Sequence, residues 1–256
     1  MNAAHVGNYG VKSADVESNS VKIKGLIGRN LEEKYSRLQA DDSLQQYLEA
    51  QQVVSIYGVD TRALVAHIRN CGAMNCVISS ETTDLQVLKT RLSQTPSMKG
   101  LELASVVSTK EVYETGNPHS RYRVAVFDYG VKKNILNCLT ERGAYVRVYP
   151  AKTALQEIED FNPHGYFMSN GPGDPAPMEY AVQTIREILQ KEKPLFGICL
   201  GHQLLAMANG IPTFKMHHGH RGLNHPVKNI ITGRSEITTQ NHGFGIDPEA
   251  VKKSDT

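Results

Sequence analysis

The sequence is poor in three features that would direct it to a membrane, a nucleic acid or a disulfide scaffold. No run of apolar residues approaches the ~20 needed to cross a bilayer, and the N-terminus lacks the apolar core of a signal peptide. Neither sign of charge dominates, since the sequence contains 28 Lys and Arg residues and 26 Asp and Glu residues. Nucleic-acid binding requires a concentrated basic face. We therefore expect a cytoplasmic protein with neither a membrane nor a nucleic-acid partner.

Cysteine is scarce, and its spacing does not suggest disulfides. The four cysteines are Cys71, Cys76, Cys138 and Cys199, and none forms a C-x-x-C pair. A chain of 256 residues with 40% hydrophobic residues can bury a core without disulfide bonds. We expect Cys71, Cys76 and Cys138 to be reduced thiols, mostly buried as small hydrophobic residues.

The first part of the chain predicts a small α/β domain over residues 1–115. After an irregular start, apolar spacing predicts helices and short strands, with Asp60 as a helix cap and Gly72 as a helix end. The predicted elements are a helix over 41–52, a buried strand over 53–57, a helix after Asp60, a strand over 76–80 and a helix over 84–92. The polar segment 109–121 is the predicted linker.

Residues 122–256 predict a second domain of the doubly wound α/β class. Short apolar runs alternate with amphipathic segments, which indicates a mostly parallel sheet with helices on both faces. The predicted strands are 124–127, 145–148, 165–168 and 195–198, and the predicted helices are 132–142, 180–192 and 200–209. In such sheets the active site lies beyond the carboxyl ends of the strands.

The strongest chemical signal is Gly197-Ile198-Cys199-Leu200-Gly201, between a predicted strand and a predicted helix. This is the pattern of a nucleophile elbow, with Cys in the position where many hydrolases carry Ser. The glycines permit a sharp, strained turn, and the helix start directs N–H groups at the sulfur, which favours the thiolate. The Leu200 N–H would face a tetrahedral oxyanion.

Two further segments follow predicted strands, but their patterns are less specific. The loop 169–175 (SNGPGDP) could expose a second oxyanion donor, or it could be a plain structural turn. It lacks the Gly-Lys-Ser/Thr and G-x-G-x-x-G patterns of phosphate-binding loops. Residues 240–244 (QNHGF) could read a polar substrate, although a loop turn explains them equally well.

Histidines gather at His217, His218, His220 and His225. A metal site is one interpretation, because imidazole favours zinc. The cluster contains neither cysteine nor carboxylate, so a solvated basic hairpin is the preferred interpretation and no metal site is predicted.

Taken together, GICLGHQ (197–203) and SNGPGDP (169–175) resemble the class I glutamine amidotransferases. The segments HVGNYGV (5–11), GVDTRALVAHIR (58–69), VFDYGVKKNILNCL (126–139), NHPV (224–227) and QNHGF (240–244) are similar to the small, glutamine-hydrolysing chain family of carbamoyl phosphate synthetase. The resemblance implies a heterodimer with a large chain that uses ATP and Mg, and no cofactor in this chain. It does not distinguish arginine from pyrimidine biosynthesis.

The resemblance also implies roles for individual residues. Cys199 would attack glutamine and form a thioester, with Leu200 and Gly171 as backbone oxyanion donors. The residues expected to bind glutamine are Gly173, Gln203, Asn241, Gly243 and Phe244.

This sequence departs from the family pattern at both ends. It contains no H-P-E, the family motif that supplies the catalytic His and Glu, and it lacks the strand-rich segment that precedes HVGNYGV in the family. We therefore expect both domains to be incomplete and activity to be impaired, because loss of a triad member costs orders of magnitude in rate. The alternatives are a non-hydrolytic partner-binding subunit, another class I amidotransferase and a cysteine hydrolase acting on esters or peptides.

Overall fold

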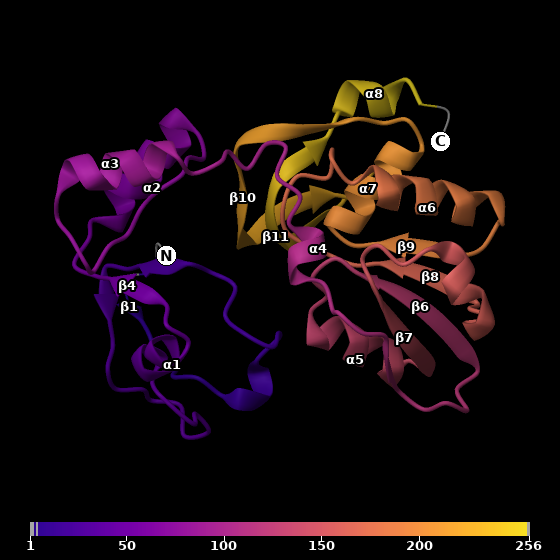
Figure 1. The fold of residues 1–256 in the computed structure, drawn as a ribbon, viewed down its shortest axis with the longest axis horizontal. Helices are drawn as coiled ribbons and strands as arrows, with labels where there is room; N and C mark the ends of the chain where they lie inside the picture. The colour runs from indigo at the N-terminus through magenta and orange to yellow at the C-terminus, as the bar shows by residue number, and fades with distance from the viewer. Residues whose placement is uncertain (1–2, 4, 255–256) are drawn as a thin grey trace. The chain divides into compact units, whose positions relative to one another are not determined.

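The computed structural model describes residue 3 and residues 5–254 (Figure 1). The chain forms two compact units, Met1–Pro96 and Ser97–Thr256. Within the described residues, no helix is both long and apolar enough to cross a bilayer.

The described residues of the first unit form two short parallel strand pairs and three α-helices. β1 (His5–Val6) pairs with β3 (Asn30–Leu31), and β2 (Gly25–Ile27) pairs with β4 (Val54–Ile56). The other elements are η1 (Ser13–Asp15), α1 (Leu44–Ala50), α2 (Thr61–Cys71) and α3 (Leu85–Ser93).

The helix α2 begins and ends at the predicted signals. Asp60 accepts hydrogen bonds from the N–H groups of Arg62 and Ala63, at 3.1 and 3.0 Å. This cap satisfies amides that have no partner inside the helix. Gly72 ends α2 with a φ of +91°, a conformation that favours glycine.

Two predictions for the first unit are wrong, and so is the expected burial of three cysteines. Residues 76–80 form no strand, and β4 is not buried, since Ile56 is 43% exposed. Cys71 and Cys76 are exposed, and Cys138 is only half-buried. Apolar β-branched residues favour a strand, but a strand is buried only where other layers cover it, and pairs of two or three residues provide too little cover.

The second unit is built on a five-stranded sheet of order β5-β7-β6-β8-β9. Strands β6 to β9 are mutually parallel, as predicted, and β5 joins the edge antiparallel to β7. The strands are β5 (Tyr113–Thr115), β6 (Tyr122–Asp128), β7 (Ala144–Pro150), β8 (Gly165–Met168) and β9 (Leu195–Gly197). The predicted linker 109–121 thus contributes a strand, and the predicted limits at 115 and 122 lie later than the division after Pro96.

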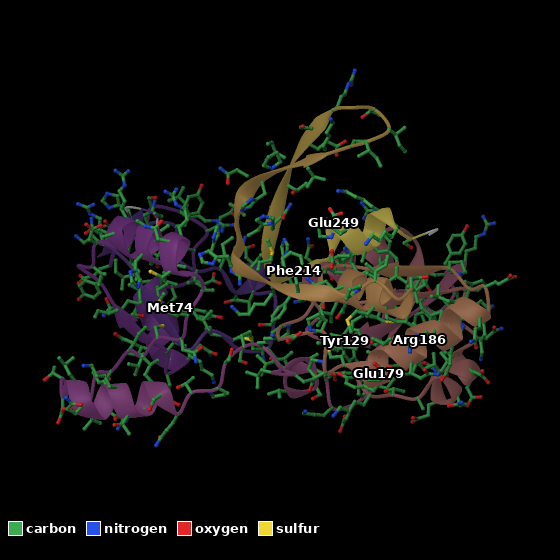
Figure 2. The ribbon with its side chains drawn as sticks, turned by 90° about the horizontal axis from the view of Figure 1, so that it is seen from above. Met74, Tyr129, Glu179, Arg186, Phe214 and Glu249 are labelled. Carbon is green, nitrogen blue, oxygen red and sulfur yellow. The ribbon has the colours of Figure 1, made fainter. Side chains whose placement is uncertain are left out.

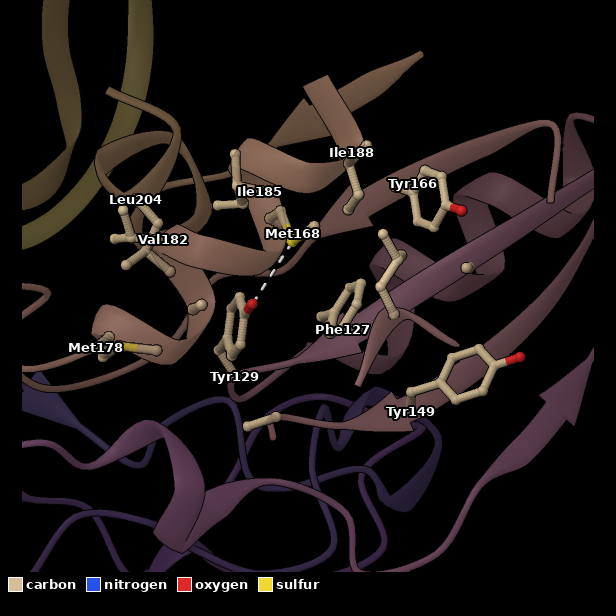
Figure 3. Packing of buried hydrophobic residues seen from close by; sticks show 14 of the residues in the cluster. Phe127, Tyr129, Tyr149, Tyr166, Met168, Met178, Val182, Ile185, Ile188 and Leu204 are labelled. Atoms are coloured by element: carbon tan, nitrogen blue, oxygen red, sulfur yellow. Dashed lines mark hydrogen bonds between the residues drawn. The ribbon is translucent and has the colours of Figure 1, made fainter. Parts of the chain in front are cut away.

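Helices cover both faces of this sheet. The helix α5 (Lys133–Glu141) packs on one face through Leu136, beside Val126 and Val146. The opposite face is covered by η2 (Leu155–Phe161), α6 (Glu179–Gln190) and α7 (Leu200–Ala208). Figure 3 shows this larger core, in which the Tyr129 hydroxyl donates to Met168 Sδ at 3.5 Å. A short helix, α4 (Ala104–Val107), precedes β5.

A long antiparallel hairpin follows α7. It consists of β10 (Thr213–Lys228) and β11 (Ser235–Ile246), and α8 (Pro248–Lys252) comes after it. Figure 2 shows the hairpin extending away from α6 and α7 beyond Phe214. The hairpin expected from the histidine-rich segment is therefore confirmed.

Candidate active site

Cys199 sits at a strained turn between β9 and α7. Its φ of +52° and ψ of −103° are unusual for a residue with a side chain, and it is the N-cap residue of α7. A Cβ added at Gly197 would lie 2.5 Å from the carbonyl carbon of Gly201. One added at Gly201 would lie 2.1 Å from the carbonyl oxygen of Met168. Both flanking glycines are therefore required sterically, and the predicted elbow is confirmed as a backbone geometry.

The electrostatic environment of the sulfur differs from the prediction. Burial raises the pKa of the Cys199 thiol above its ordinary value, because the thiolate loses solvation. A hydrogen bond from the Leu200 N–H and the charges of Arg221 and Lys132 act in the opposite direction without cancelling that effect. The Leu200 N–H at the helix start thus favours the thiolate, as the sequence predicts, but desolvation outweighs its effect on the pKa.

The loop 169–175 is fixed against the elbow. The Gly201 N–H donates to the Ser169 carbonyl at 3.1 Å, and Ser169 Oγ accepts from the Tyr129 N–H at 2.9 Å. A Cβ at Gly171 would lie 2.8 Å from Leu200 Cδ2 and 2.1 Å from the Tyr129 carbonyl oxygen. Gly171 and Leu200, the two predicted oxyanion donors, are thus neighbours.

Gly173 has a different set of contacts from the other predicted site residues. It has a φ of +95°, and it forms a β-bridge with Glu102. A Cβ there would lie 2.8 Å from the Leu101 carbonyl oxygen. These contacts place Gly173 against residues 101–103 and give it no link to the hairpin.

The remaining predicted residues meet where β11 passes α7. The buried Gln203 side chain donates from Nε2 to the Phe244 carbonyl oxygen at 2.8 Å. The same oxygen accepts from His242 Nδ1 at 2.7 Å. Asn241 and Gly243, on the same strand, both adjoin the Arg221 guanidinium. Gln203, Asn241, Gly243 and Phe244 therefore belong to one connected group.

Sequence reasoning missed two cationic side chains that act on the sulfur. Lys132 is the N-cap residue of α5, and Arg221 lies on β10 opposite Asn241. Neither stands in a motif with the cysteine, because the fold alone brings α5 and β10 to the end of β9.

Three histidines cluster on the hairpin. The His220 and His242 rings lie 4.9 Å apart between centroids, as do those of His220 and His225. The described residues hold no set of three His, Cys, Asp or Glu side chains arranged for a metal ion. Across the same residues, no histidine is hydrogen-bonded to the Cys199 sulfur; His242 instead binds the Phe244 carbonyl and Gln240.

Two regions of the chain match known protein families. Residues 125–255 match the family described as glutamine amidotransferase class-I, and residues 1–78 match the carbamoyl-phosphate synthase small chain, CPSase domain. Among curated proteins, the carbamoyl phosphate synthase small chain of Chlorobaculum tepidum is 45% identical over 96% of this chain and 68% of its own length. That of Pseudomonas putida is 46% identical over 95% of this chain and 68% of its own. That of Vibrio cholerae is 42% identical over the same two shares.

Proposed function

Because this chain belongs to the carbamoyl phosphate synthase small-chain family of class I glutamine amidotransferases, we propose that Cys199 is its glutamine-hydrolysing nucleophile. The sulfur attacks the side-chain carboxamide carbon of L-glutamine, and the C–N bond breaks to release ammonia. Water then cleaves the resulting thioester to give glutamate and the free thiol.

The observation that carries this proposal is the elbow at Cys199. A cysteine held at a positive φ between a strand and a helix start is costly to the fold, and such strain clusters at functional sites. The neighbouring loop brings Gly171 against the side chain of Leu200, the residue that follows the cysteine. Two N–H donors there would stabilise the charge that develops on the carboxamide oxygen.

We further propose that Gly173, Gln203, Asn241, Gly243 and Phe244 bind the amino-acid end of glutamine. Four of them already form a connected group through the Phe244 carbonyl and the Arg221 guanidinium. Backbone groups and carboxamides suit a zwitterionic ligand, because they can both donate to its carboxylate and accept from its ammonium. Gly173 stands apart from this group, since its contacts are with residues 101–103.

The ammonia would pass to a large chain that consumes ATP and bicarbonate with Mg, which makes this chain the smaller partner of a heterodimer. No cofactor is proposed for this chain itself. Cysteine chemistry also needs proton transfer, and within the described residues no histidine is hydrogen-bonded to the sulfur. With the thiol pKa raised by burial, we expect slow turnover by the 256-residue chain.

The test is ammonia release from glutamine, together with labelling by a glutamine-like diazo-ketone. The label reacts with the nucleophile even when turnover is slow, so the two measurements are independent. Cys199→Ser should abolish the label and lower any ammonia release by about a thousandfold or more. Cys138→Ser, half-buried on α5, is the matched control and should leave both unchanged.

Undiminished ammonia release by Cys199→Ser would remove the cysteine from the mechanism. If the wild-type chain neither releases ammonia nor takes the label, yet binds a large synthetase chain, a non-hydrolytic partner-binding subunit replaces the present proposal.

A further inference from the structure

Arg221 lies in a short stretch of the hairpin that is bounded by a register shift on each side. Residues 220–222 pair with residues 240–242, and Arg221 stands directly opposite Asn241. The register shifts on both sides of this stretch, between Lys215 and His220 and again between Gly222 and His225. Such irregularities bend a strand and re-aim its side chains, often beside active sites.

The Arg221 guanidinium contacts two residues of the proposed glutamine site. Nη1 donates to Asn241 Oδ1 at 3.0 Å, and also to the carbonyl oxygen of His220 at 3.4 Å. Nη2 lies 3.1 Å from the position that a Cβ at Gly243 would occupy. The guanidinium therefore spans the strand from Asn241 to Gly243, and a larger residue at 243 would press against it.

The hydrogen bond from Arg221 to Asn241 Oδ1 determines which end of that carboxamide is left to bind a ligand. A carboxamide has one accepting and one donating end of nearly equal size, so either could face the site. With Oδ1 bound to a permanent cation, the Nδ2 hydrogens become the end that Asn241 presents. That end recognises an acceptor, such as a carboxylate oxygen.

Arg221 also acts on Cys199 electrostatically. The arginine and the sulfur influence each other, and the positive charge favours the thiolate against the effect of burial. Lys132, at the start of α5, is the other cation acting on this thiol. One side chain thus connects the proposed substrate-binding strand with the nucleophile.

We propose that Arg221 is a positioning residue for glutamine hydrolysis: it fixes the Asn241 carboxamide with its amide hydrogens directed to the substrate, and it supplies a positive charge to the elbow. This inference rests on the function proposed above.

The experiment compares Arg221→Met and Arg221→Lys with Lys228→Met in the full chain. Lys228 is an exposed cation on the same strand outside the site, so its variant is the matched control. The first measurement is steady-state glutamine hydrolysis, with KM and kcat separated. The second is the pH profile of Cys199 alkylation by iodoacetamide without glutamine, followed on the Cys199 peptide by mass spectrometry.

We expect Arg221→Met to raise KM for glutamine by about tenfold to a hundredfold, as for a lost charge-assisted hydrogen bond. Its alkylation profile should move to higher pH by about half a unit or more, because the thiolate loses a nearby cation. Arg221→Lys should restore most of the alkylation profile but not KM, since an ammonium keeps the charge without the planar fork. Lys228→Met should match wild type in both.

The inference is overturned if either KM or the alkylation profile of Arg221→Met equals that of wild type while Cys199 remains reactive. If the wild-type chain neither releases ammonia nor takes the diazo-ketone label, the proposed function fails separately. Glutamine binding by calorimetry then replaces KM, and the alkylation profile still decides the role of the arginine charge.

Discussion

The two units of this chain differ in how completely their secondary structure is covered. In the second unit a five-stranded sheet lies between α5 and the layer of η2, α6 and α7, and residues such as Phe127 and Ile185 are fully buried. Among the described residues of the first unit, Val6 and Leu48 are the buried hydrophobic side chains. Its β-strands occur in pairs of two or three residues. Layering, more than local pattern, therefore decides which apolar runs become core.

The sharpest test of this contrast compares two glycines. Gly201→Ala in the elbow would place a methyl group 2.1 Å from the Met168 carbonyl oxygen, whereas a methyl at Gly58 in the first unit meets nothing within 4 Å. We expect Gly201→Ala to lower the free energy of unfolding by about 3 kcal/mol or more. Gly58→Ala, at a φ of +78°, should cost about 1–2 kcal/mol through backbone strain alone.

Urea denaturation followed by circular dichroism measures both variants. Equal losses of stability would show that the elbow backbone can relax, and would contradict the steric account of the elbow glycines.

Core truncation gives the next largest effect. Ile185→Ala, on the buried face of α6, should cost about 2–5 kcal/mol, because it removes buried methyl groups and leaves a cavity. Ile56→Ala, on β4, should cost less than about 1 kcal/mol, because that side chain already keeps much of its contact with water. Shifts of the urea midpoint of similar size in both variants would contradict the difference in packing.

Alkaline pH should act on the second unit through Tyr129. Burial raises the pKa of this hydroxyl above its ordinary value of about 10. A raised native-state pKa contributes stability below the ordinary value and loses it as the pH rises above that value. The wild-type unfolding free energy should therefore fall as the pH rises above about 10, and it should fall less in Tyr129→Phe.

Tyr57→Phe in the first unit is the matched control, because its side chain is exposed. An unchanged pH dependence in Tyr129→Phe would remove this tyrosine as a cause of alkaline destabilisation.

The parts of the structure that the sequence predicts well are those with local causes. Asp60 caps α2 because its carboxylate reaches amides two and three residues away, and Gly197 and Gly201 permit the Cys199 turn within five residues. The parallel order of β6 to β9 follows from alternating strands and helices. In these cases each residue acts on its near neighbours.

What the sequence does not predict depends on distant residues. The thiol pKa of Cys199 reflects burial by the whole fold and charges from Lys132 and Arg221, which lie 67 residues before it and 22 residues after it. Residues 76–80 have the composition of a strand, but they belong to none of the sheets formed by the described residues. Both errors came from judging a segment by its own residues.

The two register shifts in the hairpin have a consequence for how far its length can change without disturbing the base. The one between Gly222 and His225 separates the Arg221–Asn241 pair from the distal ribbon, where Val227 pairs with Glu236 and the turn lies beyond. Because the bulge between Gly222 and His225 can absorb a change of pairing, we expect residues lost or gained at the turn to leave the Arg221–Asn241 pairing in place. We therefore expect the outer turn to tolerate changes in length, or an inserted peptide, while the Arg221–Asn241 pairing at the base of the hairpin is kept.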